Sequence, residues 1–336
     1  MRAARRTKLA LLGALGVVVA ALVVSSVLVL AARTAAPTGP QWQPAGLQGR
    51  LVHALAPYRG GLIAGTHGGV YRESNGRWTR ILASGDVWGL TVTDAGQGIV
   101  AADNNGTADI SSNAGLTWNR VMVSPGGAYA ASHVPGGSHL LLGAVGGVFT
   151  SADHGLHWHQ RLKLTHSAVD AFAWLPGSRT TVFAGAVVDA SSGSAGVFVS
   201  RDAGQTWKPF GRNLRSTGGI MSVLAIGNRA LFGGTMGNAA WRSGIATGIW
   251  RKAAIGMPRT GDHVASMALV PGPRVKLYAG TLGFGVFRST DGGRSWTSIS
   301  SGLPAPNGQI VLSVLYDRRD HALYAGTSDG VYRLPV

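Results

Sequence analysis

Aspartates in predicted loops are the residues of this sequence best suited to catalysis. Two carboxyl groups about 5–10 Å apart can cleave a glycosidic bond, one as the acid and the other as the base or nucleophile. The aspartates available for such a role are Asp86, Asp103, Asp189, Asp262 and Asp329. We take Asp86 and Asp262 as the candidate catalytic pair. Scattered loop acids are usually only solvated, so the same residues also fit a protein without catalysis.

Arginines near the middle of the chain could bind an anionic group. Two long predicted loops contain Asp189, Arg212 and Arg215, and a later loop contains Arg259 and His263. An arginine guanidinium holds a carboxylate or phosphate through two parallel hydrogen bonds. Long loops on a rigid scaffold often carry function. These five residues are therefore the candidate binding residues, and the alternative is that they are solvated loop side chains.

No metal site and no cofactor is predicted. The chain contains no cysteine, so a disulfide, a zinc–thiolate site and a thiol nucleophile are all impossible. His154, His157 and His159 are close in sequence but belong to one predicted turn, and the loop histidines lack the spacing of metal ligands. The many glycine pairs are not followed by Gly-Lys-Ser/Thr, so they do not form a phosphate-binding loop.

A repeated box, Ser-x-Asp-x-Gly-x-Ser/Thr-Trp, organises the elements that carry these loops. Its aspartate accepts backbone N–H groups inside a turn, its glycine adopts positive φ, and its tryptophan is an apolar anchor. Asn113 and Ile245 replace the aspartate in two copies, whereas the tryptophan persists, which favours a structural role. The predicted structural residues are Asn113, Asp153, Asp202, Asp291, Trp118, Trp158, Trp207, Trp250 and Trp296.

The whole segment 42–336 is built from repeats of about 40 residues. Each repeat has an apolar strand, a strand ending in a motif such as Leu-Tyr-Ala-Gly-Thr, a Gly-Val-aromatic strand, and the box with an outer strand. The apolar strand and the strand with the Ala-Gly-Thr type of motif each occur seven times, and five copies keep the Gly-Val-aromatic sequence. Trp42 begins a segment that resembles an outer strand, and the last repeat lacks one. The sequence therefore predicts an all-β propeller of seven four-stranded antiparallel blades, closed by the N-terminal strand.

The box copies and the pattern Tyr-Ala-Gly-Thr…Gly-Val-Phe-Arg-Ser at 278–289 resemble the bacterial neuraminidase repeat, or Asp-box, family of propellers. This family includes sialidases, some endoglucanases, sortilin-type receptors and photosystem II stability and assembly factors. The resemblance implies that the box lies between the third and fourth strands, away from the usual ligand face. Glu73, the only glutamate, would lie in such a hairpin, and the Arg-Ile-Pro sequence is missing, so sialidase activity is not expected. No site residue can be transferred from the assembly factors.

The N-terminus predicts a membrane anchor. Residues 1–8 form a basic tail, 9–32 carry no charge, and 33–41 form a linker. As a helix, 9–32 would span about 36 Å, enough for a hydrocarbon core of about 30 Å. The basic flank predicts a single pass through the cytoplasmic membrane, with the propeller on the extracytoplasmic side. The alternative is a signal peptide that is cleaved to release a secreted protein.

Charge and composition indicate the kind of partner. The net charge is +16, from 30 Lys and Arg against 14 Asp and Glu, which favours anionic partners. Nucleic-acid binding needs basic and aromatic residues interleaved on one face, whereas the arginines are spread over every repeat. The predicted extracytoplasmic location also removes the usual target, so nucleic acid is not expected. We predict a non-catalytic scaffold that binds a protein client or an anionic surface polymer. The alternative is a hydrolase or lectin for cell-wall or extracellular glycans, which uses the loop aspartates.

Overall fold

The computed structural model describes residues 39–93, 96–188, 196–214, 219–258, 263–305 and 309–336, and these residues form strands and turns. The segment Gly39–Val336 is one compact unit. The described part of the chain contains no helix that is both long and apolar enough to cross a membrane. The predicted tail, the predicted span 9–32 and the linker up to residue 38 lie outside the described residues.

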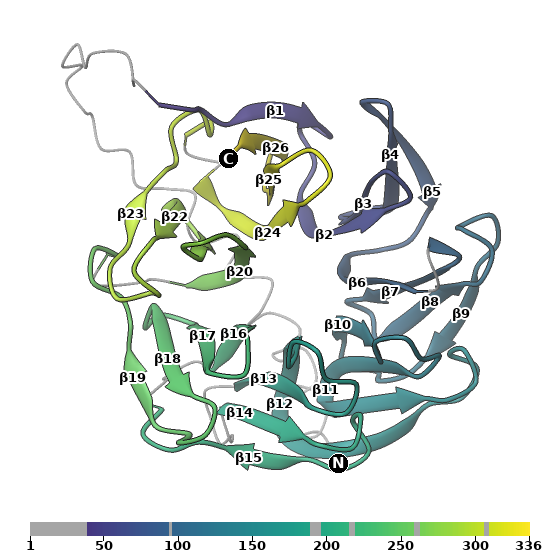
Figure 1. The fold of residues 1–336 in the computed structure, drawn as a ribbon. Coiled ribbons are helices and arrows are strands. Elements are labelled where there is room, and N and C mark those ends of the chain that lie inside the picture. The colour runs from purple at the N-terminus through teal and green to yellow at the C-terminus, as the bar shows by residue number, and fades with distance from the viewer. Residues whose placement is uncertain (1–38, 94–95, 189–195, 215–218, 259–262, 306–308) are drawn as a thin grey trace, which may run out of the picture. The chain divides into compact units, whose positions relative to one another are not determined.

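Five of the sheets have four antiparallel strands each (Figure 1). Four of these sheets use consecutive strands: β2 (Val52–Tyr58), β3 (Gly61–Thr66), β4 (Gly69–Ser74) and β5 (Arg77–Leu82); β6 (Val87–Thr93), β7 (Gly98–Asp103), β8 (Thr107–Ser111) and β9 (Asn119–Met122); β16 (Ile220–Ile226), β17 (Ala230–Thr235), β18 (Ala240–Gly244) and β19 (Trp250–Lys252); β20 (Val264–Val270), β21 (Lys276–Thr281), β22 (Gly285–Ser289) and β23 (Thr297–Ser298). The fifth combines β1 (Gln43–Gly46) with β24 (Val311–Asp317), β25 (Ala322–Thr327) and β26 (Gly330–Pro335).

The sixth sheet has six strands, and the prediction of seven four-stranded blades is wrong on this point. Its strands are β10 (Ala128–His133), β11 (Leu140–Ser151), β12 (His159–Trp174), β13 (Val182–Val188), β14 (Gly196–Ser200) and β15 (Lys208–Phe210). One half of β12 pairs with β11 and the other half with β13, so two repeats share one sheet. The connection Leu164-Thr-His-Ser167 contains neither glycine nor proline, and β12 runs through it even though His166 has a positive φ of 52°.

The N-terminal strand closes the ring, as the sequence predicted. β1 pairs antiparallel with β26, with Gln43 opposite Arg333. The Trp42 side chain is only 2% exposed, and its indole N–H donates a hydrogen bond of 2.8 Å to the carbonyl of Ile299. The first and last parts of the described chain therefore share one sheet, which leaves no gap between the ends of the repeat array.

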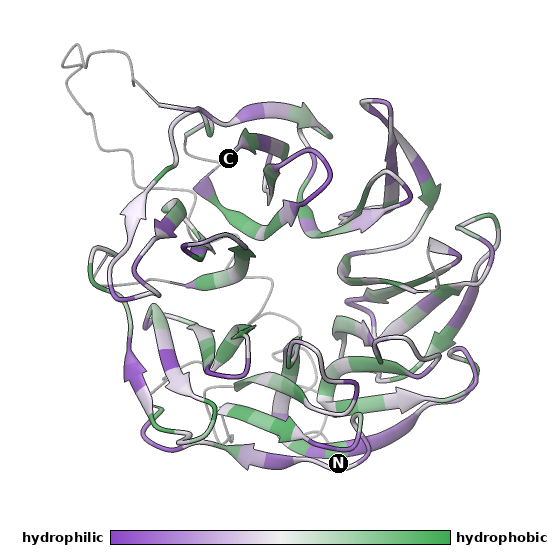
Figure 2. Ribbon diagram, in the orientation of Figure 1, coloured by the Kyte–Doolittle hydropathy of each residue, from purple (hydrophilic) through white to green (hydrophobic). Residues whose placement is uncertain are grey.

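The innermost strands β2, β6, β10, β12, β16, β20 and β24 contact one another in succession around the ring, with β24 returning to β2. The first repeat-aligned residue of each is fully buried: Val52, Val87, Ala128, Val169, Ile220, Val264 and Val311 are all 0% exposed. Figure 2 shows the hydrophobic residues within the sheets and many hydrophilic residues in the connecting turns. The core therefore consists of layers between adjacent sheets.

The glycine of the Ala-Gly-Thr motif has a packing function. A Cβ atom on Gly326 of β25 would lie 2.8 Å from Val52 Cγ1 and 3.0 Å from the Val52 carbonyl oxygen. Gly65 and Gly280 stand in the same relation to Val87 and Val311 of the next inner strands. A side chain at these positions would push neighbouring sheets apart, so the repeated glycine sets how closely the sheets approach.

Candidate functional site

The box turns hold their acids in structural hydrogen bonds. Asp202 accepts from the Thr206 N–H at 2.8 Å and the Thr206 hydroxyl at 2.6 Å, and the Ser200 hydroxyl donates to it at 2.7 Å. Hydrogen bonds from Ser295 hold the pKa of Asp291 well below its usual range. Asn113 accepts from the Thr117 N–H at 2.9 Å through its amide oxygen. The Asn113 amide oxygen therefore accepts the same turn hydrogen bond as the aspartate carboxylate in the other copies.

The box tryptophans fix these turns to the sheets. The Trp207 indole N–H donates to the Gly204 carbonyl at 3.0 Å, and Trp296 donates to Ala253 at 2.8 Å. Trp250 is only 2% exposed even though Ile245 replaces the aspartate in its repeat. The acids and tryptophans of the box therefore build the fold.

Three of the seven predicted catalytic and binding residues can be placed. Asp189, Arg215, Arg259 and Asp262 lie outside the described residues, as does any contact that they make. Arg212 is exposed, and its main chain joins the outer strand region of the next sheet, where the Trp250 N–H donates to its carbonyl at 3.1 Å. Arg212 therefore lies beside β19. The remaining two, Asp86 and His263, immediately precede the inner strands β6 and β20.

Asp86 lies between two histidines. It forms an ion pair with His67, and its Oδ1 is 3.7 Å from Nε2 of His53. The His53 imidazole is the main cause that lowers the pKa of the Asp86 carboxyl; burial opposes this, and the hydrogen bond with His67 adds to it. The distance of 3.7 Å exceeds a hydrogen bond, so the contact between His53 and Asp86 is a longer electrostatic one. His263 is partly buried, its Nδ1 has no hydrogen-bond partner, and burial lowers its pKa.

Every innermost strand has a β-bulge directly after its fully buried residue; in β2, for example, the register shifts between Val52 and Ala54. A bulge leaves one residue unpaired and redirects its side chain. The bulged residues are His53, Trp88, Tyr129, Asp170, Met221, Ala265 and Leu312. They occupy one level of the ring, at the end of the inner strands where Asp86 and His263 lie. We call these seven residues the bulge ring.

The first three members of the bulge ring contact one another in succession. The rings of His53 and Trp88 stack at a centroid distance of 4.3 Å, and Trp88 meets Tyr129 edge-on at 5.8 Å. The His53 side chain is buried, and both of its ring nitrogens lack a hydrogen-bond partner. The buried indole nitrogen of Trp88 lacks one too. Buried polar atoms are normally hydrogen-bonded, so this cluster is unusual for a purely structural core.

Asp170 continues this arc on β12. Protein surrounds its carboxyl group, although the side chain keeps partial exposure, and burial raises its pKa to about 7. Burial and then the negative charge of Asp170 raise the pKa of Tyr129 to about 12, which places the two side chains near each other. No hydrogen bond or ion pair within the described residues involves the Asp170 carboxylate. A titratable group perturbed in this way marks a candidate functional site.

Sequence reasoning missed Asp170, Trp88 and Tyr129. The signal was available, because aligning the seven inner strands on their first buried residue puts the bulge ring in one column. In that column three aromatic residues and one acid stand beside apolar residues. A core position would be apolar throughout, so the mixed column was the clue.

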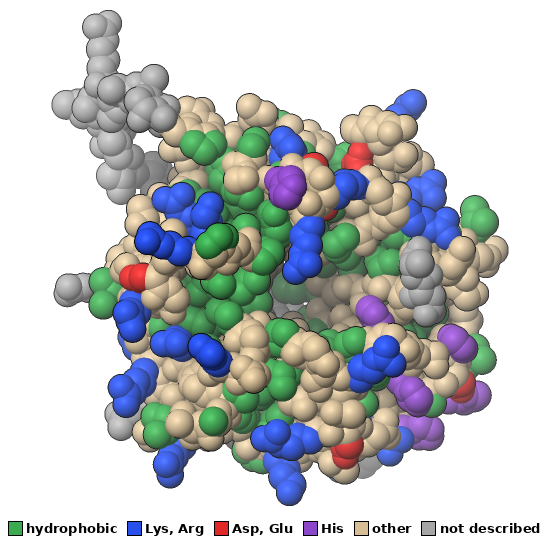
Figure 3. All heavy atoms as spheres, in the orientation of Figure 1, with side chains coloured by type: hydrophobic (Ala, Val, Ile, Leu, Met, Phe, Trp, Pro, Cys, Tyr) green, Lys and Arg blue, Asp and Glu red, His purple; other side chains and the backbone are tan. Residues whose placement is uncertain are grey.

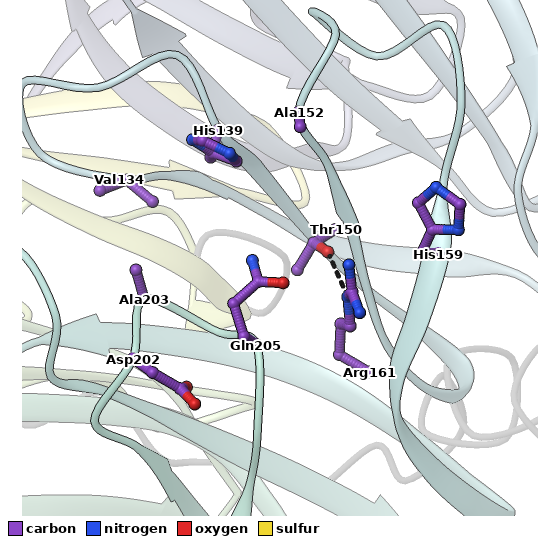
Figure 4. Close-up of a pocket in the computed structure, with 9 residues that line it drawn as sticks. All are labelled: Val134, His139, Thr150, Ala152, His159, Arg161, Asp202, Ala203 and Gln205. Atoms are coloured by element: carbon purple, nitrogen blue, oxygen red, sulfur yellow. Dashed lines mark hydrogen bonds between the residues drawn. The ribbon is translucent and has the colours of Figure 1, made fainter.

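Two cavities lie elsewhere. One, of 830 Å³, is at the opposite ends of the inner strands and is lined by Tyr58, Thr93 and His133 with the ion pair of Asp317 and Arg319. The other, of 480 Å³, lies beside two box turns (Figure 4), and its lining includes Asp202, His139 and Arg161. The Arg161 Nε–H donates to the Thr150 hydroxyl at 3.1 Å, and Asp202 belongs to its box turn, so this cavity is a groove between the two repeats of the six-stranded sheet.

Figure 3 shows a hollow at the centre of the ring in this view, with Lys and Arg side chains distributed around it. The cationic groups do not gather into one patch on this face. Among the described residues no three histidine or carboxylate side chains are arranged to hold a metal ion.

Comparisons with known proteins agree with this architecture. Residues 198–209 match the BNR/Asp-box repeat. No curated protein matches the chain. U3-55K is 14% identical with a TM-score of 0.69, over 89% of this chain and 100% of that one. A GH74 xyloglucanase from Xanthomonas campestris is 19% identical with a TM-score of 0.64, over 88% of this chain and 53% of that one.

The extracellular domain of a one component system from B. thetaiotaomicron is 13% identical with a TM-score of 0.66, over 87% of this chain. The present chain spans only 39% of that structure. Likeness at this level of identity establishes the fold alone. The protein is therefore a β-propeller with a BNR/Asp-box repeat, and its structural neighbours include both an enzyme and proteins not described as enzymes.

Proposed function

We propose that this protein is a non-catalytic scaffold, anchored to the membrane through residues 9–32, whose extracytoplasmic propeller binds an anionic partner. The observation that carries the proposal is the excess of unneutralised cationic side chains on a rigid ring. Five of the 30 Lys and Arg precede residue 42, so the propeller segment has 25 against 14 Asp and Glu. The described arginines that pair with aspartate are Arg120, Arg319 and Arg333. A field of this sign attracts acidic faces of proteins and anionic polymers.

The hydrogen bonds and ion pairs that the acids make within the protein also support a non-catalytic scaffold. The box aspartates serve their turns, and Asp86 is held between His53 and His67. Asp103 accepts a hydrogen bond of 2.7 Å from the Ser84 hydroxyl, and Asp329 accepts one of 3.0 Å from the Gly49 N–H. These carboxylates stabilise loops, and loops held in this way present a constant surface to a partner.

Cross-linking in membranes tests the proposal. Full-length protein should capture a partner, and capture should fall as salt rises, because charge attraction is screened. The triple alanine variant of Arg212, Arg215 and Arg259 should capture less of it. The triple variant of Arg77, Arg80 and Arg251, which are all exposed, removes the same charge elsewhere. Equal capture by both variants would show that the predicted loops are not the binding face, and no captured partner would refute the scaffold.

One observation favours a glycan hydrolase as the second candidate. The environments of Asp86 and Asp170 move their pKa values in opposite directions, as a base or nucleophile and an acid require. Incubation of the purified protein with a panel of wall and extracellular glycans tests this candidate. Release of sugar that is lost in Asp86→Asn and in Asp170→Asn would establish the hydrolase and overturn the scaffold. No release would leave the scaffold as the function.

A further inference from the structure

One arc of the bulge ring has features of a ligand site. It consists of His53, Trp88, Tyr129 and Asp170. Its two ends differ in charge, because His53 faces Asp86 at 3.7 Å whereas Asp170 has no cationic partner. The aromatic pair Trp88 and Tyr129 connects these ends through the edge-on contact at 5.8 Å. A carboxylate at the end of an aromatic surface is a recurring arrangement for holding organic cations.

The rest of the bulge ring cannot neutralise Asp170. The corresponding positions on β16, β20 and β24 are Met221, Ala265 and Leu312, which have no charged or strongly polar group. Tyr129 does not help, because the negative charge of Asp170 raises its pKa and the two groups oppose each other's ionisation. Within the described residues, therefore, the protein supplies no group that would compensate the Asp170 charge.

The buried nitrogen atoms are a second and independent observation. His53 is only 6% exposed, and neither of its nitrogens has a hydrogen-bond partner; the buried Trp88 Nε1 is in the same condition. Buried polar atoms in a stable core are normally hydrogen-bonded, because an unbonded one loses its hydrogen bonds to water without replacement. Three buried nitrogens without a hydrogen bond and an acid without a cationic partner therefore lie in one arc, which is unusual for residues that only support the fold.

We infer that the bulge ring binds an organic cation, a primary ammonium or guanidinium group on an apolar stem. The cationic group lies against the Asp170 carboxylate and the Tyr129 and Trp88 rings, and the stem lies along the apolar side formed by Met221, Ala265 and Leu312. Two sources share this chemistry: a Lys or Arg side chain of a polypeptide, and a free amine. The inference is independent of the proposed scaffold, because it requires neither the anionic partner nor a membrane.

Titration calorimetry with small probes tests the inference on the full-length protein. Nα-acetyl-lysinamide carries one ammonium group on an apolar stem, and Nα,Nε-diacetyl-lysinamide is its neutral counterpart. We expect saturable binding of the first with a Kd of about 1 mM or tighter, and at least tenfold weaker binding of the second. The indole N–H resonance of Trp88, assigned with Trp88→Phe, should shift during the titration.

Two variants identify the carboxylate. Asp170→Asn should weaken binding of the charged probe at least tenfold. Asp153→Asn is the matched control, because it removes one carboxylate from a box turn. In another copy of the box, Asn113 shows that an amide is tolerated at this position. Asp153→Asn should leave binding within twofold of the parent. Tyr129→Phe should also bind, since it keeps the aromatic ring, whereas Tyr129→Leu should not.

The source of the cation follows from two further probes. Acetyl-Gly-Lys-Gly-amide binding more tightly than n-butylamine would identify a polypeptide side chain, and the reverse order would identify a free amine. No saturable binding of any cationic probe, equal binding of the diacetylated probe, or unchanged binding in Asp170→Asn would each overturn the site. Loss of the site would leave the membrane cross-linking result unaffected, so the two proposals fail separately.

Discussion

Replacing Asp170 with asparagine should stabilise the protein at alkaline pH. Burial raises the pKa of Asp170 from an ordinary 3.8 to about 7. The folded state therefore binds this proton more tightly than the unfolded state, and the free energy of unfolding falls as pH rises from about 4 to about 7. Above pH 7 both states are ionised and the full penalty applies. Below pH 4 both are protonated and no penalty remains.

The size of the effect follows from the size of the shift. A shift of roughly three pKa units at about 1.4 kcal/mol each sets an upper limit of about 4 kcal/mol. Partial exposure of the side chain reduces this value, so we expect Asp170→Asn to gain about 2–4 kcal/mol at pH 8 and almost nothing at pH 4. In a domain of this size the gain corresponds to roughly 3–8 °C in Tm.

Urea unfolding of both proteins at pH 4, 6 and 8, followed by circular dichroism, measures the difference directly. The gain should grow between pH 4 and 7 and then level off. A gain of the same size at all three pH values would show that shape rather than ionisation is responsible. A variant no more stable than the parent at pH 8 would refute the uncompensated charge, and with it the physical basis of the cation site.

The close contact between β25 and β2 at the ring closure and the ion pair of Arg120 with Asp109 give two further predictions. Gly326→Ala should lower the free energy of unfolding by about 1–3 kcal/mol, because the new Cβ would meet Val52. Gly196→Ala is the control and should change the free energy of unfolding little, because no atom lies near its Cβ position. Equal losses for both variants in urea unfolding would contradict the close approach of the sheets. Arg120→Ala should cost about 1–3 kcal/mol in the same assay, because the half-exposed Arg120 donates at 2.7 Å to the side chain of Asp109, which is only 2% exposed. An unchanged midpoint would mean that Asp109 is compensated otherwise.

The repeats, the ring closure and the structural role of the box could be predicted because each depends on short-range chemistry. The Ser200 and Thr206 bonds to Asp202 all fall within one turn, and Trp42 identifies an outer strand by local pattern alone. The sheet count could not be predicted. It depends on whether the chain continues as one strand through Leu164–Ser167, as β12 does despite the positive φ of His166, and a repeat alignment treats every such connection as a loop.

The sequence by itself determined that this chain forms a propeller, since alternating strands, turn glycines and anchoring tryptophans are local signals repeated along it. It also showed that the box acids are structural, because asparagine and isoleucine take their place. Only the tertiary structure decided where a ligand could bind. His53, Trp88, Tyr129 and Asp170 are about 40 residues apart in sequence, and the bulges of four separate strands bring them to one level. Whether Asp170 has a partner depends on its neighbours around the ring, and no single repeat contains that information.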